Sequence, residues 1–185
     1  PYGNVFHTGD WKIDDEPLLG HSSSAGELEA IGDRGVLALV CDSTNVFNEE
    51  ASGSEASVRA GLDEVVGAAT GRVLVTTCAS NAARLQTLGQ VAQDTGRRIC
   101  IAGRSLDRIL RVAKAAGYLR DFPEPVDFDQ AMALPPREVL IVATGGQGEP
   151  RAALGRVAFG QHPLKLDAGD LVVFSSKQIP GNETA

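Results

Sequence analysis

The sequence predicts an α/β fold in which helices flank a mainly parallel β-sheet. Short apolar runs alternate with segments of helical periodicity along most of the chain. The runs are unbroken, which is typical of strands that are buried on both faces, and such strands build parallel sheets. The strand–helix–strand order then favours right-handed crossover connections.

The first predicted strand is a brief one at residues 4–8. Five further predicted strands are apolar runs that we expect to be buried on both faces. They span residues 36–41, 73–78, 99–101, 139–143 and 171–174.

Apolar side chains at helical spacing predict four helices, over residues 58–69, 85–92, 106–113 and 150–158. Gly96 and Gly117 close the second and third, and Pro150 suits the first turn of the fourth. The stretch 121–136 is rich in proline and acidic residues. It predicts a connection, with a short helix around residues 128–134.

Length and charge exclude several classes of protein. A chain of 185 residues holds one core-bearing domain, or one large and one partial domain. The net charge of −7 argues against nucleic-acid binding by bulk positive charge, although a local basic groove stays possible. No apolar run approaches the roughly 20 residues of a membrane-spanning helix.

The cysteines and histidines limit the kinds of site that the chain can form. Cys41, Cys78 and Cys100 lie in or beside apolar runs, which predicts buried free thiols and a cytoplasmic location. The chain has only three histidines, and no two are close in sequence. This spacing argues against a self-contained histidine-rich metal site. His7, if it lies in a strand, points away from Asp10.

Small polar residues follow nearly every predicted strand. In an open parallel sheet, ligands bind beyond the carboxyl ends of the strands. The segments there are 8–10, 42–45, 79–81, 103–105, 144–149 and 175–176. Such loops offer backbone amides and helix N-termini to an anion, and they also suit capping and tight turns. Together they favour a phosphate-rich ligand.

Three features of these loops leave alternatives open. The glycine run 145–148 has the context of a phosphate loop but matches neither nucleotide-binding spacing, which counts against a Rossmann oxidoreductase. Arg104, Arg108 and Arg111 share one helix face, which is either a solvated face or a basic groove. Asp10 and Asp42 could bind a divalent metal, orient a ligand or cap a turn.

Taken together, these motifs resemble a bacterial ribonuclease J. The segments 7–14 and 42–45 are similar to part of a metallo-β-lactamase-fold nuclease. The segments 76–81, 103–105, 144–150 and 175–183 resemble the β-CASP domain of that family, in the same order. The resemblance covers nearly the whole chain. It implies part of a metallo-β-lactamase αββα fold at residues 1–69 and a β-CASP domain at residues 70–185.

The resemblance implies a zinc-dependent ribonuclease in which a hydroxide that bridges two zinc ions attacks the phosphodiester. Asp10 matches a bridging metal ligand, and Asp42 matches a catalytic acidic residue that orients a histidine ligand. The implied partner is single-stranded RNA, with no membrane partner and a homo-oligomeric parent protein. The implied RNA-binding residues are Ser80, Asn81, Arg104, Ser105, Gly145, Gly146, Gln147, Gly148, Ser175, Ser176 and Asn182.

The chain departs from the family pattern in ways that predict a fragment. The family's HxHxDH cluster and its further histidine motifs are missing. We therefore expect the chain to be inactive by itself and not to hold two zinc ions. Cys78 stands where an aromatic residue is expected, and Gly146 where a serine is expected.

Two other readings of the function remain. One is a non-catalytic module that binds single-stranded RNA. The other is a metal hydrolase of the lactamase superfamily that acts on a substrate other than nucleic acid.

Overall fold

The computed structural model describes residues 2–11, 14, 17–20, 24–44, 46–47, 53–149 and 151–176. The chain forms two compact units, Pro1–Val58 and Arg59–Ala185. Helix α2, Glu55–Ala68, spans the boundary between them. Each unit is described by itself.

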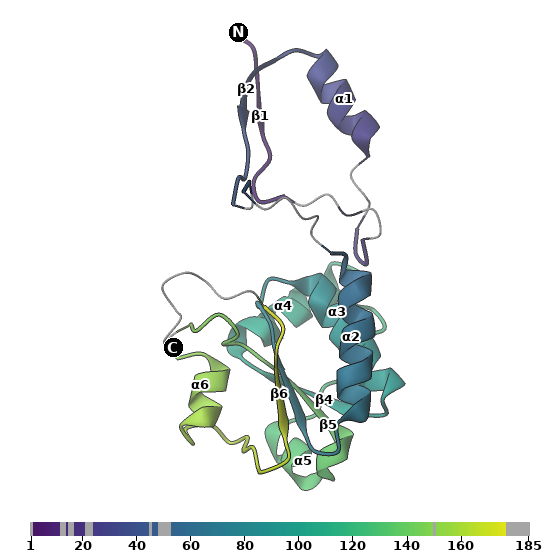
Figure 1. Cartoon of the computed structure of the whole chain (residues 1–185), viewed down its shortest axis with the longest axis vertical. Coiled ribbons are helices and arrows are strands. Elements are labelled where there is room, and N and C mark those ends of the chain that lie inside the picture. Colours follow the sequence, from purple (N-terminus) through teal and green to yellow (C-terminus); the bar gives the residue numbers. More distant parts are fainter. Residues whose placement is uncertain are drawn as a thin grey trace. The chain divides into compact units, whose positions relative to one another are not determined.

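The first unit holds two strands and one helix. Strand β1, Asn4–His7, pairs in parallel with β2, Val36–Val40, and helix α1, Ala25–Asp33, precedes β2 (Figure 1). Ser24 begins α1 with a capping box: its hydroxyl accepts from the Glu27 amide, and the Glu27 carboxylate accepts from the Ser24 amide.

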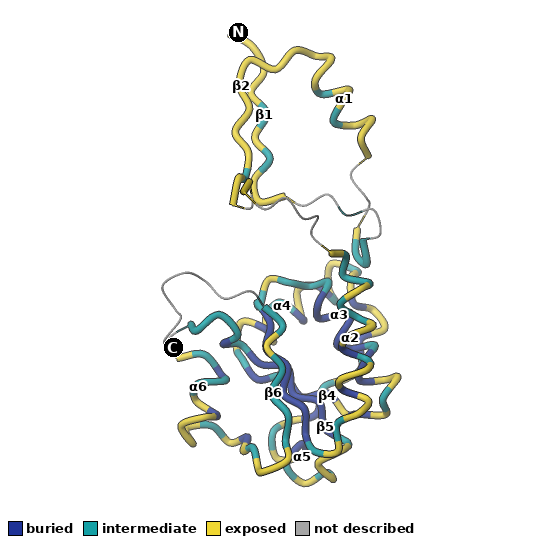
Figure 2. The backbone as a smooth tube through the Cα atoms, in the orientation of Figure 1, coloured by how far each residue is buried: buried dark blue, intermediate teal, exposed yellow. Residues whose placement is uncertain are grey.

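The prediction that β2 is buried on both faces is wrong for this unit. All five β2 residues are exposed, and no described residue before Leu62 is buried (Figure 2). Two strands and one short helix supply no second layer that could cover the sheet. The described part of this unit therefore has no hydrophobic core.

The second unit is the α/β domain that the sequence predicts. Its sheet has four parallel strands in the order β4-β5-β3-β6 (Figure 1). These strands are β3, Val73–Thr76; β4, Arg98–Ala102; β5, Val139–Ala143; and β6, Leu171–Phe174. The helices that connect them are α3, Ala82–Asp94; α4, Arg104–Ala115; α5, Phe128–Ala133; and α6, Ala153–Ala158. A 3₁₀ turn, Pro136–Glu138, leads into β5.

The two central strands carry the core. Every residue of β3 and β5 is buried (Figure 2). One set of side chains from the strands, including Leu74 and Ile141, packs with Ala131 of α5 and Val157 of α6. Alternate strand residues point to the opposite face. Helices α3 and α4 contact each other and both contact β4.

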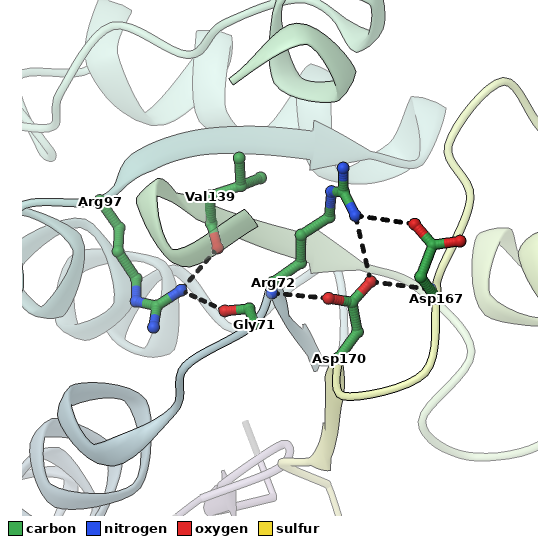
Figure 3. Close-up of polar contacts among 6 residues, drawn as sticks. All are labelled: Gly71, Arg72, Arg97, Val139, Asp167 and Asp170. Carbon is green, nitrogen blue, oxygen red and sulfur yellow. Dashed lines mark hydrogen bonds and ion pairs between the residues drawn. The ribbon is translucent and has the colours of Figure 1, made fainter. Parts of the chain in front are cut away.

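Two buried arginines hold together the amino-terminal ends of the strands (Figure 3). Arg97 donates to the carbonyls of Val66, Ala69, Gly71 and Val139. Arg72 donates from its amide and its guanidinium to Asp170, and its guanidinium also pairs with Asp167 at 3.1 Å. Both arginines are about 6% exposed.

Helix α6 begins later than the sequence predicts. It starts at Ala153, and Pro150 lies outside the described residues. The amide of Ala153 donates to the Thr144 hydroxyl at 3.1 Å, so a side chain from the end of β5 satisfies the first amide of the helix. The short helix predicted near residue 128 is α5, whose capping box joins Asp127 and Gln130.

Cysteine burial also differs from the prediction of three buried thiols. All three cysteines are free, but only Cys100 is buried, while Cys78 is half-buried and Cys41 is exposed. Burial raises the pKa of the Cys100 thiol to about 12, with a smaller effect from the negative charge of Asp127. Cys41 follows β2 and is exposed with it, because this unit has no covering layer.

No helix in the described part of the chain is long and apolar enough to cross a membrane.

Candidate functional site

Four loops follow the carboxyl ends of the strands in the second unit, and we call them the exit loops. They are residues 77–81 after β3, 103–105 after β4, 144–149 after β5 and 175–176 after β6. Because all four strands are parallel, these loops lie along one edge of the sheet. Ten of the eleven RNA-binding residues implied by the resemblance lie in them, and Asn182 lies outside the described residues.

The exit loops of β5 and β6 meet at Gly146, beside the last residue of β3. A Cβ atom placed on Gly146 would collide with the Ser176 hydroxyl and would lie 2.6 Å from the Thr76 hydroxyl. The absent side chain therefore lets the β5 loop approach the end of β3 and the loop that follows β6. The Ser176 hydroxyl is buried and has no hydrogen-bond partner in the described structure. It is a polar group enclosed by small residues, with capacity left to bind another polar atom.

Thr144 joins the exit loops of β4 and β5. Gly103 has a φ of +146°, and a Cβ atom there would lie 2.9 Å from the Thr144 side chain. Gly145 has a φ of +118°, a conformation that favours glycine. The Thr144 amide also donates to the Ala102 carbonyl at 3.2 Å, which extends the strand pairing by one residue. These contacts fix the starts of both loops.

Asn81 begins α3, and its side-chain oxygen accepts from the Arg84 amide at 2.9 Å. Arg84 is nearly buried, at 9% exposure for the whole residue, and its guanidinium reaches across to the β6 exit loop. There Nη1 donates to the Ser175 carbonyl at 2.9 Å and also contacts the Ser175 hydroxyl. Ser80 lies beside Cys78, with 3.3 Å between the hydroxyl oxygen and the sulfur.

Sequence reasoning missed Arg84, although a signal was present. Arg84, Leu88 and Val91 are spaced at i, i+4 and i+7, so they share the buried face of α3. An arginine in an apolar stripe must satisfy its guanidinium with buried acceptors. Only the fold identifies that acceptor as Ser175.

Arg104 and Ser105 begin α4, and both are exposed. Arg108 and Arg111 are exposed on the same helix, and Arg111 pairs with Asp107 at 2.9 Å. The face is therefore solvated in this structure, and its cations are accessible to a polyanion. Arg104 is the one nearest to the end of a strand.

Asp10 and Asp42 lie in the first unit, after β1 and β2 respectively. The Thr8 amide donates to the Val40 carbonyl, and the Asp42 amide donates to the Thr8 hydroxyl at 3.3 Å. Hydrogen bonds from the Thr44 hydroxyl and amide lower the pKa of Asp42. Asp42 therefore stays ionised and shapes its own turn, while Asp10 is exposed.

The described residues do not by themselves fit a pair of zinc ions. Among them, no three His, Cys, Asp or Glu side chains lie close enough together to hold a metal ion. His7 instead accepts from the Gly9 amide through Nδ1 at 3.0 Å. His162 packs against Phe128 with ring centroids 4.8 Å apart. His21 lies outside the described residues.

The parallel sheet and its polar exit loops define an α/β domain, and comparison with known families assigns it to the β-CASP class. Residues 70–185 match the family model described as "Ribonuclease J, beta-CASP domain". The chain therefore belongs to the ribonuclease J family.

Curated relatives extend the similarity over the whole chain. It is 42% identical to "Ribonuclease J" of Sinorhizobium meliloti over 99% of its length and 40% identical to "Ribonuclease J" of Thermus thermophilus over 100%. It is 38% identical to "Ribonuclease J2" of Bacillus subtilis over 98%. These alignments cover 33%, 32% and 33% of the relatives, so the chain spans about a third of their length.

Proposed function

We propose that this chain is part of a ribonuclease J-type enzyme that hydrolyses RNA phosphodiester bonds, and that its exit loops form one wall of the RNA-binding groove. The observation that carries the proposal is the meeting of the β5 and β6 exit loops beside the end of β3, around Gly146 and Ser176. The family membership of residues 70–185 supports it. In this proposal the parent protein acts on single-stranded RNA.

Small residues and hydroxyl groups suit phosphate binding at this edge. Backbone amides and hydroxyls donate to phosphate oxygens without the bulk of a long side chain. The Ser176 hydroxyl and the loop 145–148 are our candidates for this role. The Gln147 amide already donates to the Glu149 carboxylate at 2.9 Å, so a phosphate could accept from this amide only after that hydrogen bond breaks. Arg104 supplies a mobile cation at the edge.

Residues 1–69 belong, in this proposal, to part of a metallo-β-lactamase-like fold, and residues 70–185 to the β-CASP domain. Asp10 is a candidate zinc ligand and Asp42 a candidate positioning carboxylate. Because the described residues do not hold a zinc pair, the proposal places the other ligands outside the described residues. We propose a cytoplasmic, homo-oligomeric parent with 5′-exonucleolytic activity, endonucleolytic activity or both.

Binding of RNA by the 185-residue chain tests the groove. We expect the chain to bind a fluorescein-labelled single-stranded oligoadenylate, and Arg104→Ala to weaken binding. If Arg104 contacts one phosphate, its loss lowers the slope of log K against log salt by about 0.7. Arg111→Ala, which removes a cation already paired with Asp107, is the matched control. If Arg104→Ala binds RNA as tightly as the unmodified chain, Arg104 does not contribute to the RNA-binding groove.

Metal analysis tests whether this chain carries only some of the zinc ligands of the parent protein. We expect the purified 185-residue chain to hold no stoichiometric zinc after dialysis. Tight binding of two zinc ions by this chain would show that it contains a complete site and would contradict the proposal.

The lack of a clustered metal site among the described residues also favours a second candidate, a non-catalytic module that binds single-stranded RNA. The parent protein separates the candidates. Hydrolysis of RNA but not of small esters supports the ribonuclease, whereas RNA binding without hydrolysis supports the module. Hydrolysis of small esters alone indicates a lactamase-superfamily enzyme with another substrate.

A further inference from the structure

We propose that Arg84 is a positioning residue for RNA binding, which fixes the β6 exit loop so that the Ser176 hydroxyl lies beside Gly146. This inference rests on the proposed RNA-binding function of the exit loops. It concerns a residue from α3 that acts through Ser175.

The guanidinium of Arg84 is placed for this role. Arg84 is nearly buried, and a buried charge is tolerated only where it is hydrogen-bonded. Its Nη1 donates to both oxygens of Ser175, the carbonyl and the hydroxyl. On the other side of the residue, the Ser175 amide donates to the Thr76 carbonyl at 3.1 Å. Ser175 is therefore held from β3 through its amide and from α3 through its carbonyl.

Fixing Ser175 also fixes the position of the next residue, Ser176. Ser176 follows Ser175 directly, and its hydroxyl occupies the space where a side chain on Gly146 would be. That hydroxyl is buried without a partner in the described structure. Its position depends on the backbone of Ser175, because a serine side chain has only one rotatable bond that places its oxygen. Loosening Ser175 would move the Ser176 hydroxyl out of this position.

Arginine suits the contact better than lysine does. The two N–H groups of Nη1 are held in the guanidinium plane, so this one nitrogen donates to the carbonyl and the hydroxyl of Ser175 in a fixed geometry. The ammonium of lysine keeps the charge but is a compact group on a flexible stem. The Arg84 backbone is itself fixed, because its amide donates to Asn81. One residue thus joins the exit loops of β3 and β6.

Affinity measurements on the 185-residue chain test this role. The variants are Arg84→Lys, Arg84→Gln, Ser175→Ala and Arg84→Lys with Ser175→Ala, and the probe is a fluorescein-labelled single-stranded oligoadenylate. Loss of the buried hydrogen bonds predicts about tenfold weaker binding for Arg84→Lys and Arg84→Gln. Ser175→Ala removes the contact to the hydroxyl and leaves the bond to the carbonyl, so we expect a smaller loss for it and little further loss when it is combined with Arg84→Lys.

Arg59→Lys is the matched control. Arg59 also links its guanidinium to α3, through Gln90 at 2.8 Å and Asp94 at 2.9 Å, but at the far end of that helix. We expect its RNA affinity to match that of the unmodified chain. Thermal unfolding confirms that each variant is folded before its affinity is compared.

Two further readouts separate positioning from direct contact. The salt dependence of binding should be unchanged in Arg84→Gln; a slope lower by about 0.7 would mean that Arg84 itself contacts phosphate and would overturn the inference. Without RNA, amide hydrogen exchange at Ser175 and Ser176 should be faster in Arg84→Lys than in Arg59→Lys. Equal exchange in these two variants would also overturn it.

The proposed function and this inference fail in different ways. If the unmodified chain does not bind the oligoadenylate, the proposed groove is wrong and the role of Arg84 falls with it. If the unmodified chain binds and Arg84→Lys binds equally well, only the role of Arg84 is wrong.

Discussion

At the scale of single residues, Gly146 shows how a departure from the family pattern acquires a physical reason. The resemblance to ribonuclease J led us to expect a serine at this position. In the structure, the hydroxyls of Thr76 and Ser176 already lie where its side chain would be. The glycine and the two hydroxyls form one packed unit, so a change at any one of them affects the others.

We predict that Gly146→Ala lowers the free energy of unfolding by about 1–3 kcal/mol, because overpacking shifts the buried Thr76. Urea denaturation measures this change. Gly61→Ala is the control, since Gly61 lies within α2 with nothing within 4 Å of an added Cβ. We expect that variant to be stabilised by about 0.5–1 kcal/mol. An unchanged midpoint for Gly146→Ala would refute the packing argument.

His162 is a second residue whose environment has a measurable consequence. Burial lowers its pKa, and the positive charge of Arg156 lowers it further. Its Nδ1 accepts from the Leu164 amide at 3.2 Å, which requires that nitrogen to be unprotonated.

A lowered pKa in the folded state means that the unfolded chain binds more protons below the unperturbed histidine value of about 6.5. The contribution of His162 to stability is therefore complete above that pH and is lost as the pH falls below it. We predict that His162→Gln flattens the decline in unfolding free energy between pH 7 and pH 5. Urea denaturation at several pH values in this range measures the profile, and an unchanged decline in His162→Gln would contradict the argument.

At the scale of elements, Arg97 joins a helix to two strands. Its guanidinium donates to Val66 and Ala69 at the end of α2. It also donates to Gly71 and Val139 near the starts of β3 and β5 (Figure 3). Cations stabilise helix C-termini because the last carbonyls lack partners within the helix. Burial lowers the pKa of Arg97, and the four carbonyls replace the lost hydration.

We predict that Arg97→Met lowers the unfolding free energy by roughly 3 kcal/mol, because four carbonyls lose a charged donor. Arg98→Met is the matched control, as Arg98 is the next residue and is exposed on the edge strand β4. Its effect should stay within about 0.5 kcal/mol. Equal urea midpoints for the two variants would show that the Arg97 contacts contribute no net stability.

The predicted elements agree with the structure best where local pattern is sufficient. The run 139–143 is strand β5, and the helix predicted at 106–113 lies within α4. The same reasoning was wrong about burial in β2, which is exposed, and in the edge strand β6, none of whose residues is fully buried. An apolar run shows that a strand needs cover but not whether that cover is present. It placed the start of α6 too early, because the first helical amide is satisfied by the Thr144 hydroxyl at the end of the preceding strand and not by a cap near Pro150.

At the scale of the whole molecule, the two units differ in how far they bury their apolar side chains. The second unit buries a continuous set from all its central strands, whereas Val5, Leu37 and Leu39 of the first unit are exposed. A segment whose described residues include no fully buried side chain gains little free energy to offset the entropy of ordering its backbone.

We predict that limited proteolysis of the 185-residue chain cleaves within Pro1–Val58 first and leaves a resistant fragment that begins near Arg59. Mass spectrometry of a trypsin time course identifies the cleavage sites. Early cleavage at Arg72 or Arg97 would contradict this, since both arginines are buried in the second unit.

The sequence by itself determined the α/β class, most strand and helix positions, the ribonuclease J resemblance and the exit loops that carry the candidate site. These features are local, because each depends on residue spacing or on a short motif. Tertiary structure alone decided the strand order β4-β5-β3-β6, the close approach of Gly146 to Ser176 and the bond from Arg84 to Ser175. Arg84 and Ser175 are 91 residues apart, and only the pairing of β3 with β6 brings the two loops together.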